Sequence, residues 1–169
     1  MLALKTVCFS GYRPEKFTFN LLGDHEDYRT LESRIEAEII NAVNSGYSNF
    51  MCGMAKGFDL ICGGMLLKVK QASPEYAILK LIAVPPYHGH NFSGIWGEIH
   101  RLVMHQADEI HCQVEKFSMY AYQARNRYMV DHSSRLICYY GGQTGGTHNT
   151  VMYARGKRVE VVNLFPLKS

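Results

Sequence analysis

Short apolar runs alternate with longer amphipathic segments along the whole chain, and this alternation limits the folds that it can adopt. Such a rhythm is typical of a parallel sheet covered by helices. We expect strands at residues 4–9, 48–52, 78–84, 109–112, 135–140 and 158–163. We expect helices at residues 29–44, 58–71, 94–105, 118–131 and 147–155. The pattern predicts an α/β fold: a Rossmann-like, three-layer open sheet, mostly parallel, with about six strands and helices on both faces.

Local signals support individual helices. Residues 29–44 carry an apolar side chain at every fourth position, which gives one face to the core. Ser93 and Ser118 stand at the start of two other helices and can cap their N-termini. Phe117 and Tyr122 have the spacing of a hydrophobic staple around the second cap.

Length and composition set the class of protein. At 169 residues, with no linker, repeat or low-complexity segment, residues 1–169 are expected to form a single domain. Hydrophobic residues make up 47% and charged residues 20%, which argues against disorder. A net charge of +3 suits phosphorylated small molecules and neither requires nor excludes a nucleic acid.

The chain shows no sign of a membrane or secretory location. No apolar stretch approaches the roughly 20 residues that span a bilayer, and the start lacks the features of a signal peptide. The five cysteines are odd in number and form no CxxC pair, so buried thiols in a reducing compartment are expected. These features predict a cytoplasmic protein without a membrane partner.

Three loops that follow predicted strands have unusual sequences. In open parallel sheets, ligands bind outside the carboxyl ends of the strands. The first loop contains Ser10, Gly11 and Arg13. Gly11 allows the backbone to approach a ligand, and Arg13 offers a forked cation for phosphate or carboxylate. A plain turn with a solvated arginine is the alternative.

The second loop, residues 52–59, runs from a strand end into a helix start. Gly53 and Gly57 permit a tight turn with exposed N–H groups beside a helix N-terminus, which attracts anions. Asp59 can cap free N–H groups or accept a hydrogen bond from a ligand hydroxyl. The loop matches neither the Walker A nor the GxGxxG pattern, and a plain glycine turn is the alternative.

The third loop, residues 141–147, has four glycines and two threonines in seven positions. Turn geometry alone usually requires one or two glycines. A nest of N–H groups with threonine hydroxyls forms a good anion cradle. The ligand-binding candidates here are Gly142, Thr144, Gly145, Gly146 and Thr147.

The expected helix at 118–131 lies between the second and third loops in the sequence. Arg125 and Asn126 are placed to reach over a pocket, whereas Met129 and Val130 are expected to pack inward. An exposed basic face is the alternative interpretation.

Together these motifs resemble the SMF/DprA–LOG (SLOG) superfamily, and most closely its YpsA-like branch. Residues 10–14 look like the opening G-[HY]-[RK]-P loop, and residues 125–133 match an R-N-x-x-M-[VI]-D-x-S helix end. Gly53, Ala55, Gly57 and Asp59 are similar to an S-G-x-A-x-G-x-D turn, with Cys52 replacing the serine. Residues 141–147 occupy the place of a G-G-x-G-T loop. The resemblance implies a Rossmann-like domain that binds nucleotides or their derivatives, in a superfamily of enzymes, sensors and single-stranded DNA binders.

The chain departs from the LOG enzymes of this superfamily at one position. Those enzymes cleave an N-glycosidic bond with a glutamate three residues after the G-T of their glycine loop, and Thr150 stands there in this chain. A threonine cannot act as a general base or stabilise an oxocarbenium-like transition state as a carboxylate does. Nothing in the sequence points to Asp59 or Glu98 as a substitute, so no catalytic residue is assigned.

Binding or sensing of a nucleotide or nucleotide-derived phosphate ligand is the leading hypothesis. A LOG-type nucleotide N-glycoside or phosphoribosyl hydrolase, and a DprA-like single-stranded DNA binder, are the alternatives. Such a nucleotide is the one ligand or cofactor suggested, and a homodimer is left open. His88 and His90 lack a third ligand at suitable spacing, so no metal site is predicted.

Overall fold

The structure is a computed structural model that describes residues 5–166. Its core is a six-stranded, all-parallel sheet in the order β4-β3-β2-β1-β5-β6. The strands are β1 (Thr6–Gly11), β2 (Asn49–Cys52), β3 (Lys80–Ala83), β4 (Glu109–Ile110), β5 (Arg135–Tyr139) and β6 (Glu160–Asn163). The predicted open α/β sheet is therefore confirmed. Position 4 of the first expected strand lies outside the described residues.

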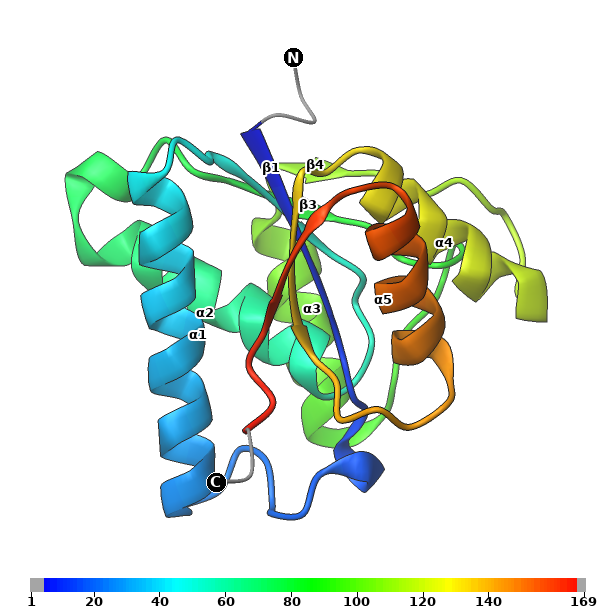
Figure 1. The fold of residues 1–169 in the computed structure, drawn as a ribbon, viewed down its shortest axis with the longest axis horizontal. Coiled ribbons are helices and arrows are strands. Elements are labelled where there is room, and N and C mark those ends of the chain that lie inside the picture. Colours follow the sequence, from blue (N-terminus) through cyan, green and yellow to red (C-terminus); the bar gives the residue numbers. More distant parts are fainter. Residues whose placement is uncertain (1–4, 167–169) are drawn as a thin grey trace.

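Helices cover both faces of this sheet, which gives the three layers that the sequence predicts (Figure 1). One face packs against α1, α2 and α3, and the other against α4 and α5. The helices are α1 (Glu26–Asn44), α2 (Phe58–Ala72), α3 (Gly94–Gln106), α4 (Met119–Asp131) and α5 (Gly146–Gly156), with two short 3-10 helices, η2 (Pro14–Lys16) and η3 (Pro74–Tyr76).

The strands on either side of β1 determine where a ligand crevice can form in this sheet. Val7 pairs with Phe50 of β2 on one side and with Arg135 of β5 on the other. The connection after β1 leads to α1 on one face, and the connection after β5 leads to α5 on the opposite face. Strand order therefore reverses between β1 and β5, and the crevice outside their carboxyl ends is where such sheets bind ligands.

Helix starts show which local signals operate. The Ser118 hydroxyl accepts a hydrogen bond from the Ala121 N–H at 3.2 Å, and the rings of Phe117 and Tyr122 lie 6.2 Å apart, so the predicted cap and staple of α4 are confirmed. Ser93 occupies the N-cap of α3, but its side chain makes no capping hydrogen bond there.

Most element boundaries differ from the prediction by one to three residues, and two of these differences have a clear cause. Helix α1 starts three residues earlier than expected, because His25 Nδ1 accepts a hydrogen bond from the Asp27 N–H at 3.1 Å and caps the helix. Strand β4 has two residues rather than four, since only Glu109 and Ile110 pair with β3.

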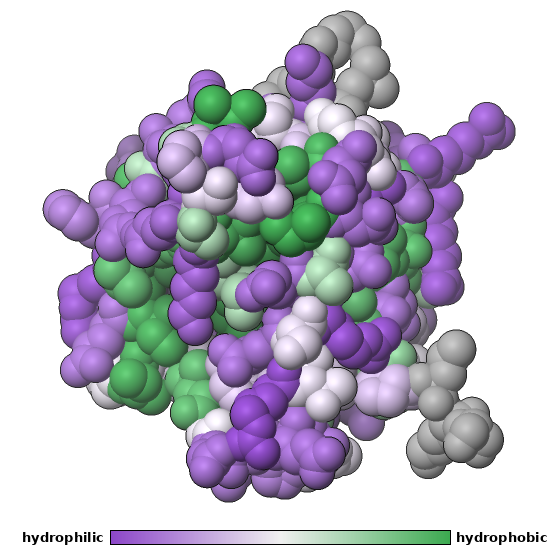
Figure 2. Space-filling view, turned by 90° about the vertical axis from the view of Figure 1, so that its left-hand side faces the viewer, coloured by the Kyte–Doolittle hydropathy of each residue, from purple (hydrophilic) through white to green (hydrophobic). Residues whose placement is uncertain are grey.

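The face of the molecule that carries α1 is mainly polar (Figure 2). Figure 2 shows the face that carries α1, where hydrophilic residues dominate and hydrophobic ones gather in patches between them. Within residues 5–166, no helix combines the length and the apolar character needed to cross a membrane. All five cysteines are unpaired, and Cys112 is the one that is not buried.

Candidate functional site

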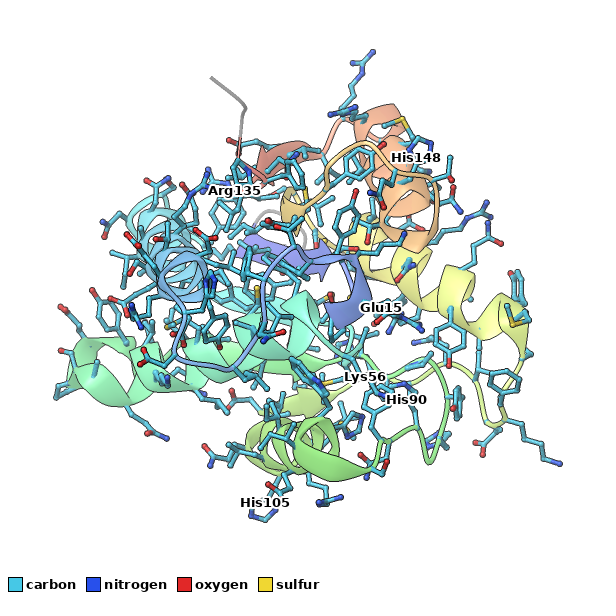
Figure 3. All side chains as sticks on the ribbon, turned by 90° about the horizontal axis from the view of Figure 1, so that it is seen from below. Glu15, Lys56, His90, His105, Arg135 and His148 are labelled. Carbon is cyan, nitrogen blue, oxygen red and sulfur yellow. The ribbon has the colours of Figure 1, made fainter. Side chains whose placement is uncertain are left out.

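The three unusual loops meet at the carboxyl edge of the sheet and enclose a pocket of about 170 Å³. Figure 3 looks onto this edge of the molecule. Nine of the residues selected from the sequence line the pocket: Ser10, Gly11, Arg13, Ala55, Asp59, Arg125, Asn126, Gly146 and Thr147. The remaining lining residues are Tyr12, Glu15, Lys16 and Tyr122.

The other five selected residues do not line the pocket. Gly53 lies behind Asp59, and Gly57 is the N-cap of α2. Gly142, Thr144 and Gly145 belong to the third loop but not to the pocket wall.

Tyr12 joins the first loop to the other two. Its buried hydroxyl accepts hydrogen bonds from the N–H groups of Gly141, at 2.7 Å, and Gln143, at 3.3 Å. Its carbonyl oxygen accepts one from the Phe58 N–H, at 3.2 Å, where α2 begins. This role of Tyr12 was not predicted from the sequence, although the aromatic position in the G-[HY]-[RK]-P motif was a signal for it.

Lys16 and Glu15 bring charge to the rim of the pocket from η2. Lys16 Nζ donates a hydrogen bond to the Thr144 carbonyl oxygen at 3.2 Å, so it reaches across to the third loop. Glu15 is exposed and lines the same pocket, and Figure 3 labels its position at this edge of the molecule. Neither residue was selected from the sequence, because a short turn after Pro14 carries no pattern that fixes side-chain direction.

The floor of the pocket holds a buried carboxylate, that of Asp59. It is 4% exposed, and burial raises its pKa to about 6 even though the Arg125 guanidinium and the N–H groups of Ala55 and Gly11 favour its ionised form. Both Asp59 and Arg125 lie close to the Cα atom of Gly53, where an added Cβ would meet Asp59 Oδ2 at 2.8 Å and Arg125 Nη1 at 3.1 Å.

Arg125 lies in the floor rather than over the pocket. It donates hydrogen bonds to the Gly53 carbonyl oxygen and, through Nε, to Asn126 Oδ1 at 2.7 Å. Burial lowers its pKa, while the Asp59 carboxylate acts in the opposite direction. The expectation that its side chain reaches over the pocket is therefore wrong. Met129 and Val130, expected to pack inward, are buried.

The N-terminus of α5 supplies backbone donors. The first helical hydrogen bond runs from the Asn149 N–H to the Gly145 carbonyl oxygen at 3.0 Å, so the N–H groups of Gly146, Thr147 and His148 precede the helical ladder. No side chain caps this helix start. Because the helix dipole adds positive potential here, this wall favours an anion.

Tyr122 forms an aromatic wall between two cations. The guanidinium carbons of Arg13 and Arg125 lie 5.8 and 5.7 Å from its ring centre. Behind it, His90 Nδ1 lies 3.2 Å from His100 Nε2, and burial, followed by the neighbouring His100, Arg125 and Arg13, lowers the pKa of His90 to about 4. In the described part of the chain, no cluster of three side chains suits a metal ion.

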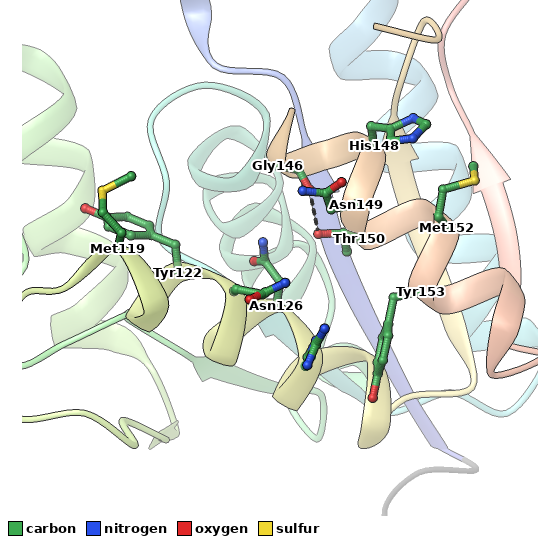
Figure 4. Close-up of a pocket in the computed structure, with 11 residues that line it drawn as sticks. Met119, Tyr122, Asn126, Gly146, His148, Asn149, Thr150, Met152 and Tyr153 are labelled. Carbon is green, nitrogen blue, oxygen red and sulfur yellow. Dashed lines mark hydrogen bonds between the residues drawn. The ribbon is translucent and has the colours of Figure 1, made fainter. Parts of the chain in front are cut away.

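A larger groove of about 670 Å³ adjoins the pocket between α4 and α5 (Figure 4). It shares Tyr122, Asn126 and Gly146 with the pocket. Thr150, at the position of the LOG glutamate, is buried in its wall and donates a hydrogen bond to the Gly146 carbonyl oxygen at 2.9 Å. None of the eleven residues that line the groove is an aspartate or a glutamate, and Glu98 lines neither cavity.

Comparisons with known proteins found one matching family model and solved structures of similar fold. The family model YpsA, described as the YspA SLOG family, matches residues 7–165. DNA processing protein A from Helicobacter pylori, reported for its single-stranded DNA binding mode, has a TM-score of 0.61 and 18% identity over 96% of this chain and 66% of that one. DNA processing protein A from Streptococcus pneumoniae has a TM-score of 0.64 and 17% identity, with 95% and 50% covered.

The chain spans about two thirds and one half, respectively, of the lengths of these two neighbours. At such identities the likeness shows a shared fold. No curated protein sequence matches the chain.

Proposed function

The chain belongs to the YspA SLOG family, and from this premise we propose that it binds a nucleotide or nucleotide-derived phosphate ligand at the carboxyl edge of its sheet. The observation that carries the proposal is the pocket itself. It brings the N-terminus of α5, the Thr147 hydroxyl and the cations of Arg13, Lys16 and Arg125 around one small cavity. Backbone donors and forked cations of this kind are the groups that bind phosphate.

The balance of charge suits a phosphorylated sugar better than a simple anion. Three cations face two carboxylates, Glu15 and Asp59, and the helix dipole of α5 adds further positive potential. The cations and N–H groups attract a phosphate, whereas carboxylates accept hydrogen bonds from hydroxyl groups. A ligand with both a phosphate and free hydroxyls satisfies the two sets of groups at once.

The third loop offers a matched pair of variants for the test. Gly145 and Gly142 both have positive φ, at 141° and 97°, so a Cβ strains the backbone at either position by about 1–3 kcal/mol. At Gly145 the added Cβ would also meet Lys16 Nζ at 2.8 Å, whereas at Gly142 it meets nothing within 4 Å. Only Gly145→Ala is expected to displace Lys16 and disturb the pocket.

We expect the midpoint temperature of thermal unfolding of the wild type to rise in the presence of at least one ligand of a panel. The panel contains inorganic phosphate, nucleoside mono-, di- and triphosphates, NAD and ADP-ribose. A ligand at 100 times its dissociation constant adds about 2.7 kcal/mol to the stability. Gly145→Ala should lose most of that shift, and Gly142→Ala should keep it. If none of these probes stabilises the wild type, or if both variants respond equally, the proposed site is wrong.

Single-stranded DNA binding is a second candidate. One support is α4, where Tyr120 and Arg127 are exposed on either side of Tyr122, which lines the pocket. The other is the single-stranded DNA binding reported for the Helicobacter pylori neighbour. This candidate predicts affinity for oligodeoxynucleotides that falls steeply as salt rises. Affinity that is absent or independent of salt excludes it.

A hydrolase of LOG type has one supporting observation, the Asp59 carboxylate in the floor of the pocket. The backbone N–H groups of Ala55 and Gly11 and the Arg125 guanidinium already favour the ionised form of that carboxylate. Release of a free base from nucleoside monophosphates, lost in Asp59→Asn, would support catalysis. No turnover with any of them would leave binding as the function.

A further inference from the structure

The small pocket cannot hold a whole nucleotide. Its volume of about 170 Å³ lies below the range of about 300–1,000 Å³ that is usual for small-molecule sites. The adjoining groove between α4 and α5, at about 670 Å³, lies within that range. Because the two cavities share Tyr122, Asn126 and Gly146, a ligand that fills the pocket with its phosphate can continue directly into the groove.

The groove differs from the pocket in its chemistry. Amide side chains line it at Gln123, Asn126 and Asn149, and phenol rings line it at Tyr122 and Tyr153. Figure 4 shows Asn126 on the α4 wall and Asn149 on the α5 wall. Amides offer both donors and acceptors, and aromatic rings offer flat apolar faces. These groups suit a flat, uncharged heterocycle with polar edges.

The small number of charged residues in the groove also favours an uncharged ring. Its one permanently charged lining residue is Arg127, whose guanidinium carbon lies 5.4 Å from the ring centre of Tyr153. The rest of the lining is neutral or apolar, including the side chains of Met119 and Met152 at its edges. A second phosphate would find few partners in this groove, whereas a nucleobase would find many.

Distances along α5 match the size of a nucleotide. From Gly146, in the pocket, to Thr150, in the groove, the helix rises by about 6 Å at 1.5 Å per residue. Tyr153, which also lines the groove, lies about 4.5 Å further along. A ligand whose phosphate lies at the helix N-terminus can therefore run past Asn149 and Thr150 and reach Tyr153.

We infer that the α4–α5 groove is the base subsite of a free nucleotide whose phosphate lies in the pocket. The inference rests on the proposed function and adds to it the part of the ligand that is recognised. Tyr122 and Tyr153 provide stacking surfaces, and the amides of Asn126 and Asn149 read the polar edge of the base.

The test compares ligands that differ only by the base. Calorimetric titration of the full chain uses AMP, GMP, CMP and UMP, with ribose 5-phosphate and inorganic phosphate as probes of the pocket alone. Base stacking on aromatic side chains corresponds to a factor of about five to one hundred or more in affinity. At least one nucleoside monophosphate should therefore bind about fivefold or more tightly than ribose 5-phosphate.

A groove variant separates the two parts of the site. Asn149→Leu changes an exposed residue of α5, and it should reduce nucleotide affinity towards that of ribose 5-phosphate without changing the affinity for ribose 5-phosphate. The matched control is Asn41→Leu on the exposed face of α1, which should behave as the wild type.

Several outcomes overturn the inference. Equal affinity for nucleotides and ribose 5-phosphate means that the groove adds nothing, although the phosphate pocket stands. No binding of any probe removes the proposed function as well. Tighter binding of an oligothymidylate without a terminal phosphate than of thymidine monophosphate assigns the groove to a nucleic-acid strand. A change of mass in sedimentation caused by Asn149→Leu assigns it to a second copy of the chain.

Discussion

Gly53 shows how a single residue without a side chain arranges the charges of the pocket. Asp59 and Arg125 approach its Cα atom from α2 and α4, and Met129 closes the third side. An alanine here would place its Cβ 2.8 Å from Asp59 Oδ2 and 3.1 Å from Met129 Cε. Because buried atoms surround this position, the space cannot be recovered cheaply.

We expect Gly53→Ala to destabilise the protein by about 1–3 kcal/mol, the usual cost of overpacking, and to weaken phosphate binding by moving Asp59 and Arg125. The matched control is Gly64→Ala within α2, where an added Cβ meets nothing within 4 Å. There, alanine should stabilise the helix by about 0.5–1 kcal/mol. Urea unfolding checks both, and equal stability of the two variants would contradict this account.

The composition of the three loops predicted where the candidate site lies better than it predicted which side chains form it. Glycines in all three loops, and threonines in the third, marked the candidate site, because few other sequences combine so many exposed backbone donors with hydroxyl groups. The roles of Tyr12 and Lys16 depend on contacts with residues more than 120 positions away in the sequence. No local pattern encodes such contacts, and the buried place of Arg125 depends in the same way on the distant Gly53.

At the scale of elements, the agreement between sequence and structure follows from periodicity. Strands buried on both faces give continuous apolar runs, and β1 and β5 are clear examples, with all of their residues buried except Gly11. The edge strand β4 was expected to be longer, because apolar character alone does not say how many residues find a partner. The capping of α1 by His25 lies outside the usual set of N-cap residues and was missed.

Two serine N-caps allow a matched prediction at this scale. Ser118 accepts a hydrogen bond from the Ala121 N–H at the start of α4, whereas Ser93 makes no such bond at the start of α3. Ser118→Ala should therefore cost about 1 kcal/mol of stability, and Ser93→Ala much less. Denaturant titration measures both. Similar losses of stability in the two variants would mean that the hydrogen bond to Ser118 stabilises the helix no more than a hydrogen bond from the Ala121 N–H to water does.

The strand order of the whole molecule determines where the site lies. The chain moves outward from β1 through β2, β3 and β4, and then crosses to the other side of β1 for β5 and β6. This reversal opens the crevice between β1 and β5 in which the first and third loops meet. The sequence predicted helices and strands but not this order, because the order depends on which faces pack together rather than on any single segment.

Two buried groups of the site act on the stability of the whole molecule in opposite directions. Burial raises the pKa of Asp59 from 3.8 to about 6, so between these values the folded state binds more protons than the unfolded state. Its contribution therefore increases as the pH falls from 6 to 4. Burial lowers the pKa of His90 from 6.5 to about 4, so the folded state binds fewer protons and its contribution decreases over the same interval.

Each of the two contributions is about 3 kcal/mol, at 1.36 kcal/mol per pKa unit, so they nearly cancel in the wild type. Because the pKa values of His100, Asp108 and Glu109 are also lowered, we expect the free energy of unfolding of the wild type to decrease between pH 6 and pH 4. Asp59→Asn removes the carboxylate contribution, so its stability should fall more steeply with acidification than that of the wild type. His90→Asn removes the histidine contribution, so its stability should fall less steeply than that of the wild type. Denaturant unfolding at several pH values gives the slopes. Because all other ionisable groups are common to the three proteins, parallel curves would show that these two pKa values are close to normal.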